Sequence, residues 1–216
     1  MVPIKTNIAH RGNYGGTRQL SQIKYIVIHY TANDGDTDEN NSIHFKNNDV
    51  DASAHYFVDD DSITQSVPDN YIAWHCGAKK YKHSQCRNTN SIGIEICDDV
   101  KNGVIYPSAK TIENVLDLTK SLMKKYNVPK ENIIRHFDVT GKLCPAYWVD
   151  DTKWKSEFWN KLTTNELTSA NDIVWELNHS YFPITDIESF VMQLDEAKQE
   201  NSSLYWGYYK LVNKIK

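Results

Sequence analysis

The segment that most constrains the fold is residues 91–97, SIGIEIC, because its isoleucines recur at every second position. In a β-strand this period places the three isoleucines on one face, with Gly93 and Glu95 on the other. The pattern therefore predicts a strand with one face in a hydrophobic core. Glu95 then either faces solvent or lines a cleft.

Other segments rich in β-branched and aromatic residues also predict strands: 24–30, 53–59, 62–67 and 132–136. The two middle segments flank three aspartates and predict a hairpin. Residues 108–126 carry apolar residues at helical spacing after a candidate N-cap, Ser108, and predict the longest helix. Residues 151–162 predict a helix that closes the first domain. Strands interleaved with helices indicate an α/β or α+β sheet domain.

The composition changes after residue 162. The polar residues 163–168 predict a linker between a first domain, 1–162, and a small all-α module, 169–216. We expect three short helices in this module: 169–177, one that starts at the capping box of Thr185 and Glu188, and 202–215. Residues 164–216 hold four lysines and eight acidic residues, so they carry the whole net charge of −4.

Charge and apolar patterning exclude some functions. A net charge of −4 provides no basic field, so nucleic acid is not an implied partner. No apolar run approaches the roughly 20 residues needed to cross a bilayer, which argues against membrane insertion. Residues 1–16 lack the apolar region of a secretory signal, so we expect synthesis in a cytoplasm. Cys76 and Cys86 could pair across a loop, although a reducing compartment disfavours this.

Three residues far apart in the sequence are candidate metal ligands. His29 lies near the carboxyl end of the strand predicted over 24–30. His136 precedes Cys144 by eight residues, with a Gly-containing turn between them. Imidazole and thiolate are the usual ligands of zinc. Three protein ligands with a fourth position open to water are typical of a catalytic zinc site. The alternative for each histidine is a half-buried, hydrogen-bonded side chain.

A hydrolytic metal site also needs a group that takes and returns a proton. Glu95 is the candidate, because burial in its apolar segment would raise its pKa toward a useful range. Lys142 could stabilise an oxyanion, or it could be a solvated surface lysine. His55, His75 and Trp74 lie in aromatic surroundings and are candidate substrate-binding residues. Either histidine could instead be a satisfied core residue.

These residues belong to a longer pattern. Residues 24–148 resemble the zinc-dependent N-acetylmuramoyl-L-alanine amidases of the phage lysozyme and peptidoglycan-recognition-protein superfamily. The matching segments occur in the order of the family: 26–32, 53–68, 73–77, 90–97 and 133–148. The resemblance implies a mixed α/β fold, in which a central mixed sheet is flanked by helices.

The resemblance also implies roles. His29, His136 and Cys144 correspond to the ligands of Zn²⁺, and Glu95 to the catalytic carboxylate. Lys142 corresponds to a lysine or threonine near the third ligand. Some relatives have a catalytic tyrosine where this chain has Ala54, so we expect Glu95 to carry the proton transfer.

The function implied is hydrolysis of the amide bond between N-acetylmuramic acid and L-alanine in peptidoglycan. We expect a phage endolysin of a Gram-positive host that reaches the wall through a holin-type pore. The alternatives are a bacterial autolysin, a non-catalytic peptidoglycan-binding protein, against which Cys144 argues, and a structural zinc protein. Residues 169–216 are expected to bind the cell wall. They could instead form a lid or a dimer contact.

Overall fold

The computed structural model describes residues 2–33, 35–101, 104–162 and 187–199. The chain divides into two compact units, Met1–Thr163 and Thr164–Lys216. The division lies beside the end of the predicted first domain. The roles of the two units stay predictions.

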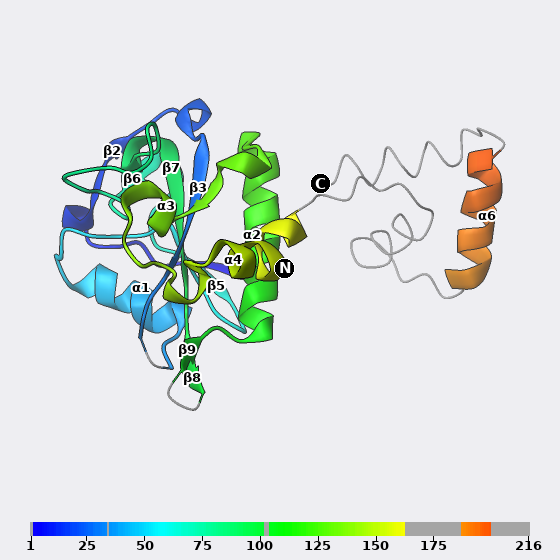
Figure 1. The fold of residues 1–216 in the computed structure, drawn as a ribbon, viewed down its shortest axis with the longest axis horizontal. Coiled ribbons are helices and arrows are strands. Elements are labelled where there is room, and N and C mark those ends of the chain that lie inside the picture. Colours follow the sequence, from blue (N-terminus) through cyan, green and yellow to red (C-terminus); the bar gives the residue numbers. More distant parts are fainter. Residues whose placement is uncertain (1, 34, 102–103, 163–186, 200–216) are drawn as a thin grey trace. The chain divides into compact units, whose positions relative to one another are not determined.

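A six-stranded sheet forms the centre of the first unit (Figure 1). Its strands are β1 Ile4–Thr6, β3 Tyr25–Tyr30, β4 Tyr56–Val58, β5 Ile63–Gln65, β7 Ser91–Ile96 and β10 Ile133–Arg135. Their order is β1-β5-β4-β7-β3-β10. The predicted hairpin of β4 and β5 is antiparallel, and the other neighbours pair in parallel. The mixed central sheet is thus confirmed.

Two short antiparallel pairs of strands lie outside this sheet. They are β2 Tyr14–Thr17 with β6 Tyr71–Ala73, and β8 Asp99–Lys101 with β9 Val104–Tyr106. All four strands are three or four residues long, which leaves no alternation to detect in the sequence.

The described residues of the first unit form four α-helices: α1 Asp38–Asn47, α2 Ala109–Tyr126, α3 His136–Thr140 and α4 Asp151–Glu157. Helix α2 begins as predicted, because the Ser108 hydroxyl accepts hydrogen bonds from the N–H groups of Lys110 and Thr111. It ends at Asn127, which has a left-handed φ of 51°. The helix predicted over 151–162 is divided at Phe158 into α4 and a 3₁₀ turn, Trp159–Leu162.

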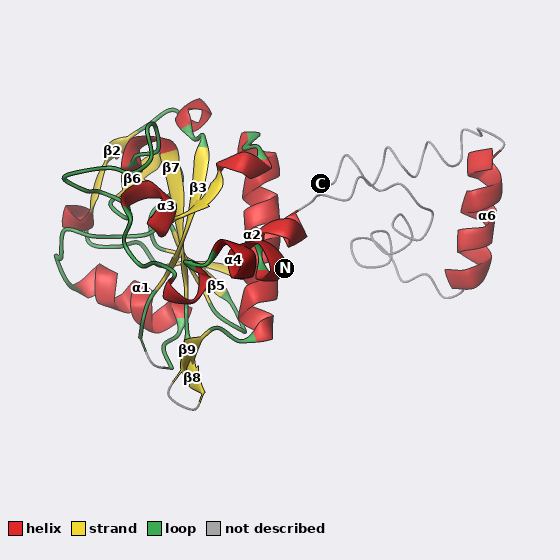
Figure 2. Cartoon of the chain, in the orientation of Figure 1, coloured by secondary structure: helices red, strands yellow, loops and turns green. Residues whose placement is uncertain are grey.

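Helices cover both faces of the sheet (Figure 2). On one face, α2 and α4 pack against the strands through a core cluster to which Ile28, Ile92 and Ile94 belong. On the other face, Phe45 of α1 stacks on Phe57 of β4, with ring centroids 5.4 Å apart. Because helices pack on both faces of the sheet, the sequences of β3 and β7 are typical of buried strands.

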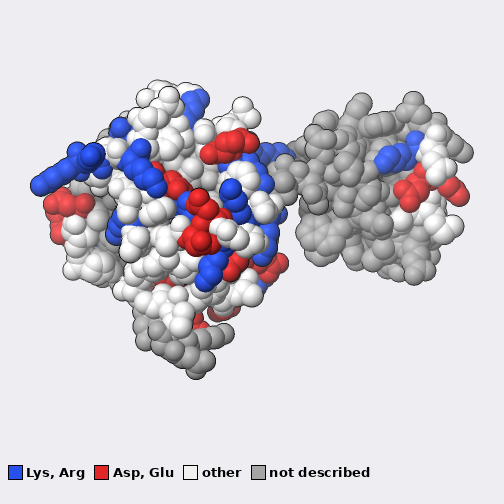
Figure 3. Space-filling view, in the orientation of Figure 1, with Lys and Arg blue, Asp and Glu red and all other residues white. Residues whose placement is uncertain are grey.

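The surface of the first unit carries charges of both signs. On the face drawn in Figure 3, acidic and basic side chains of the described residues are interspersed, so no field of one sign forms there.

In the second unit the structure describes α6, Ile187–Gln199, next to the predicted capping box. The predicted linker 163–168 and the helices 169–177 and 202–215 lie outside the described residues. Within the described part, no helix has the length and apolar character to span a membrane.

Candidate active site

The candidate site lies where three neighbouring parallel strands end. His29 is the next-to-last residue of β3, and Glu95 is the next-to-last residue of β7. The strand register places these two residues directly opposite each other. On the other side of β3, His136 follows the last residue of β10. Because the carboxyl ends of parallel strands share one edge of a sheet, the three side chains meet there.

The segment between His136 and Cys144 is a short helix rather than the simple turn that the sequence suggested. Helix α3 ends at Gly141, whose φ of 88° is left-handed and therefore favours glycine. The chain then turns back, and the Phe137 N–H donates to the Cys144 carbonyl over 2.9 Å. This closed segment brings the Cys144 thiol to the end of β3.

The donor atoms of His29, His136 and Cys144 lie within 4.8 Å of one another, and all three residues are buried. The Cys144 Sγ atom is 3.8 Å from Nδ1 of His29. Nδ1 of His136 is buried and has no hydrogen-bond partner among the described residues. A buried nitrogen without a partner is costly unless something else binds it. Together, the two imidazoles and the thiol form a donor set that fits zinc.

The protonation of this set also suits a metal. Burial lowers the pKa of His29 well below its ordinary value, and burial with the nearby Lys142 charge lowers that of His136 to about 4. Both imidazoles are therefore neutral at pH 7, the form that ligates metals. Burial and the neighbouring Glu95 raise the pKa of the Cys144 thiol to about 12. A metal bound there must displace the thiol proton.

Glu95 faces this donor set and not the apolar core. Its Oε1 atom is 3.8 Å from Nδ1 of His29, and only 20% of its side chain is exposed. Its Oε2 atom is buried with no hydrogen-bond partner in the described structure. Burial raises the pKa of Glu95 to about 8, although the charge of Lys142 partly opposes the shift. The sequence left open whether Glu95 faces solvent or a cleft, and in the structure it faces the donor set.

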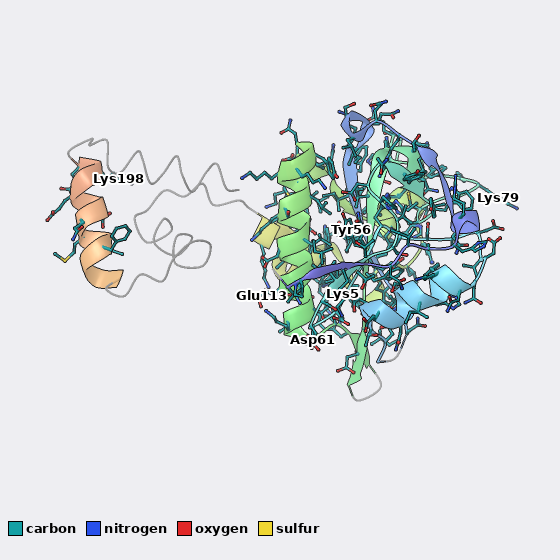
Figure 4. The ribbon with its side chains drawn as sticks, turned by 180° about the vertical axis from the view of Figure 1, so that it is seen from behind. Lys5, Tyr56, Asp61, Lys79, Glu113 and Lys198 are labelled. Carbon is teal, nitrogen blue, oxygen red and sulfur yellow. The ribbon has the colours of Figure 1, made fainter. Side chains whose placement is uncertain are left out.

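A cavity of about 470 Å³ opens beside the donor set. It is lined by Asp51, Ala52, Trp74, His75, Gly77, Asn88, His136, Thr140 and Lys142. The wall of the cavity therefore includes Trp74 and His75, two of the three residues predicted to bind substrate. It also includes Lys142, which was predicted to be catalytic. By contrast, Lys79 lies at the outer edge of the unit in Figure 4 and does not line the cavity.

The third residue predicted to bind substrate, His55, is fully buried and does not line this cavity. Its Nδ1 accepts a hydrogen bond from the Gly93 N–H over 3.0 Å. Its Nε2 lies 2.9 Å from Nη2 of the buried Arg18. His55 thus corresponds to the core-histidine alternative.

His75 combines both alternatives, since it lines the cavity but is only 9% exposed. Its Nδ1 lies 3.0 Å from Nε2 of His29, and its Nε2 lies 3.1 Å from Oγ of Ser91. The sequence analysis missed Ser91. The available signal was its phase, because Ser91 shares a strand face with Gly93 and Glu95.

The neighbouring cysteines make no disulfide in the described structure. Cys76 and Cys86 are both buried free thiols, and both belong to a small cluster with Tyr25, Val27 and Val139. Their pairing across a loop, left open by the sequence, is not observed.

Comparison with known proteins agrees with this geometry. A family model described as N-acetylmuramoyl-L-alanine amidase matches residues 19–147. The chain is 35% identical over 174 residues to the N-acetylmuramoyl-L-alanine amidase CwlL of Bacillus licheniformis, a match of 75% of this chain and 47% of the relative. It is 34% identical over 157 residues to the amidase BlyA of Bacillus subtilis, covering 67% of this chain and 42% of that protein. The chain thus spans about half the length of the curated relatives it matches.

Solved structures show the same fold. An endolysin mutant from Bacillus subtilis aligns with a TM-score of 0.63 and 32% identity, covering 76% of this chain and 100% of the other. The catalytic domain of XlyA aligns with a TM-score of 0.62 and 32% identity, covering 75% of this chain and all of that domain.

Proposed function

This chain belongs to the N-acetylmuramoyl-L-alanine amidase family, and we propose that it hydrolyses the bond between N-acetylmuramic acid and L-alanine in peptidoglycan. The observation that carries the proposal is the buried set of His29, His136 and Cys144, beside Glu95 and an open cavity. An endolysin structure from Bacillus subtilis shares the fold. So does the catalytic domain of XlyA, an N-acetylmuramoyl-L-alanine amidase of the same species.

The proposed cofactor is a zinc ion held by His29, His136 and Cys144. When bound, it would polarise the scissile carbonyl and lower the pKa of a water molecule. Nδ1 of His136 has no hydrogen-bond partner in the described part of the chain, and the donors are mixed nitrogen and sulfur. Both observations support this choice over a hard cation, which prefers oxygen ligands.

Glu95 is the proposed proton carrier. Its carboxylate takes the proton of the attacking water at Oε1 or Oε2 and returns it to the nitrogen of the departing L-alanine amine. Burial raises the pKa of Glu95 above that of an ordinary carboxyl group, which makes its carboxylate a stronger base for the first transfer.

Lys142 is the proposed stabiliser of negative charge. It is exposed on the cavity wall, two residues before Cys144. Its charge lowers the pKa of both His136 and Glu95. An ammonium in this position attracts the oxyanion that forms when the carbonyl is attacked. Trp74, on the same wall, offers an aromatic face for a sugar or a peptide side chain.

At the level of the whole protein, we propose a phage endolysin that acts on the bacterial wall, with residues 169–216 binding that wall. The likeness to an endolysin structure supports the first part, and a bacterial autolysin would use the same site. Deleting residues 165–216 should reduce the amount of protein that sediments with purified cell walls. Unchanged sedimentation would rule out wall targeting by this segment.

Mass spectrometry of digested cell wall tests the reaction. We expect new free amino groups on L-alanine, with glycan strands and internal peptide bonds intact. Pretreatment with a strong chelator should abolish the product, and added zinc should restore it. Cleaved glycan, or full activity in thoroughly metal-free protein, would contradict the proposal.

A further inference from the structure

We propose that His75 is a positioning residue, which holds His29 in the tautomer that can ligate a metal. The inference rests on the proposed function, because it concerns the way in which one proposed zinc ligand is prepared. It changes the expected role of His75 from contact with substrate to support of His29.

The direction of the hydrogen bonds carries the argument. The Ser91 hydroxyl lies 2.7 Å from the Arg87 carbonyl, which can only accept, so the hydroxyl hydrogen points there. Oγ of Ser91 can then only accept from Nε2 of His75, 3.1 Å away. A neutral imidazole with its hydrogen on Nε2 has an accepting Nδ1. His29 must therefore donate from Nε2 across the 3.0 Å contact.

This direction decides what His29 presents to the site. With the hydrogen on Nε2, the lone pair of His29 is on Nδ1. Nδ1 is the atom that lies 3.8 Å from Sγ of Cys144 and 3.8 Å from Oε1 of Glu95. The chain from the Arg87 carbonyl through Ser91 and His75 thus selects the tautomer with its free lone pair toward the donor set. Metal-bound histidines commonly need such an acceptor on the other nitrogen.

Strand β7 is shaped to hold the His75 ring. A Cβ atom added to Gly93 would lie 2.5 Å from Cγ of His75, so only glycine leaves room for the ring there. Ser91 and Gly93 precede Glu95 at two-residue intervals, and all three serve the same site. Ser91 receives the hydrogen of His75, Gly93 accommodates its ring, and Glu95 faces the opposite nitrogen of His29.

Zinc affinity, measured on the full chain by competition with a chromophoric chelator, tests the proposal. His75→Ala and His75→Phe remove the acceptor, and the second retains a ring of similar size, so both should bind zinc about 10- to 100-fold more weakly. His75→Asn should recover most of the affinity, because its side-chain oxygen can accept near the position of Nδ1. Ser91→Ala should show a smaller loss, since His75 remains but its tautomer is no longer imposed.

Two controls make the result specific. Ser84→Ala changes an exposed serine seven residues before Ser91 and should leave zinc affinity unchanged. Nitrogen NMR of the imidazoles in metal-free protein should show His29 protonated at Nε2 in the wild type and as a mixture of tautomers in Ser91→Ala, a readout independent of activity.

The outcomes separate the two proposals. If the wild type binds zinc and the His75 variants bind it equally well while wall lysis falls, His75 acts on substrate and the inference is overturned. If His75→Ala and His75→Phe do not fold, equal zinc affinity in wild type, His75→Asn and Ser91→Ala, with unchanged His29 tautomer, overturns it. A wild type that binds no zinc contradicts the proposed function itself.

Discussion

The two faces of strand β7 differ in what they contribute. On one face, Ile92, Ile94 and Ile96 are completely buried and belong to the main core cluster. On the other, Ser91 and Glu95 place polar atoms beside His75 and His29. The apolar face removes hydrocarbon from water and stabilises the fold. The polar face includes a buried carboxyl oxygen without a described partner, which costs stability.

The difference teaches how one strand can serve both purposes. Because side chains alternate across a strand, each face can be changed without altering the chemistry of the other. The rigid core face fixes the backbone, and the backbone fixes Glu95 opposite His29. A substitution on the polar face should therefore affect chemistry more than stability, and a substitution on the core face should do the reverse.

The largest effect should come from Glu95→Gln. Glutamine retains the shape of the side chain but cannot accept a proton from water, so wall hydrolysis should fall by roughly 10²- to 10⁴-fold. Zinc content should be unchanged, because Glu95 is not one of the three donor residues. Hydrolysis rates on purified wall, with metal analysis of the same sample, measure both quantities. Near-normal hydrolysis would remove Glu95 from the mechanism.

The matching change on the core face is Ile94→Ala. It deletes a fully buried side chain next to Glu95 and should lower the free energy of unfolding by about 2–5 kcal/mol. Zinc affinity and the hydrolysis rate per folded molecule should stay close to wild type at a temperature where the variant is folded. Denaturant titration gives the stability. A variant that is stable but inactive would show that the two faces are not independent.

Gly93→Ala is expected to have a smaller effect on stability than Ile94→Ala. It should change both stability and zinc affinity, the quantities assigned above to separate faces. The new methyl group would lie 2.5 Å from the His75 ring, which must move. Overpacking of this kind costs about 1–3 kcal/mol. Zinc affinity should fall as in the His75 variants, although no polar atom has been removed. Unchanged zinc affinity would mean that the ring can shift without releasing His29.

Much of the structure of β7 could be predicted from the sequence, because the alternation of its side chains is a local pattern. The alternation around Glu95 predicted both faces, and Ser108 marked the start of α2. The meeting of His29, His136 and Cys144 was predicted from residue types and from the family resemblance. The structure brings their donor atoms within 4.8 Å.

Other features depend on contacts that no local pattern records. The bond between His29 and His75 joins residues 46 positions apart. The complete burial of His55 depends on Arg18, a residue that polarity alone would place at the surface. The start of α3 at His136 depends on the short closed segment that ends at Cys144, and strand periodicity cannot detect it. Long-range packing decides each of these.

The smallest predicted effect concerns pH and isolates the cost of the polar face. In metal-free protein, burial raises the folded-state pKa of Glu95 to about 8, above its ordinary 4.5. Between these values the folded state holds one proton more than the unfolded state, so raising the pH favours unfolding. From pH 6 to pH 7, the wild type should lose about 1 kcal/mol of unfolding free energy relative to Glu95→Gln.

The comparison with Glu95→Gln is needed because the histidines titrate in the opposite sense. Burial lowers the pKa of His136 to about 4, so the unfolded state binds the extra proton and stability rises with pH up to about 6.5. This contribution is common to both proteins and cancels in their difference. Denaturant titrations of both metal-free proteins at the two pH values measure what remains. A constant difference would show that Glu95 is ionised in the folded state at both values, so that the polar face carries no such cost.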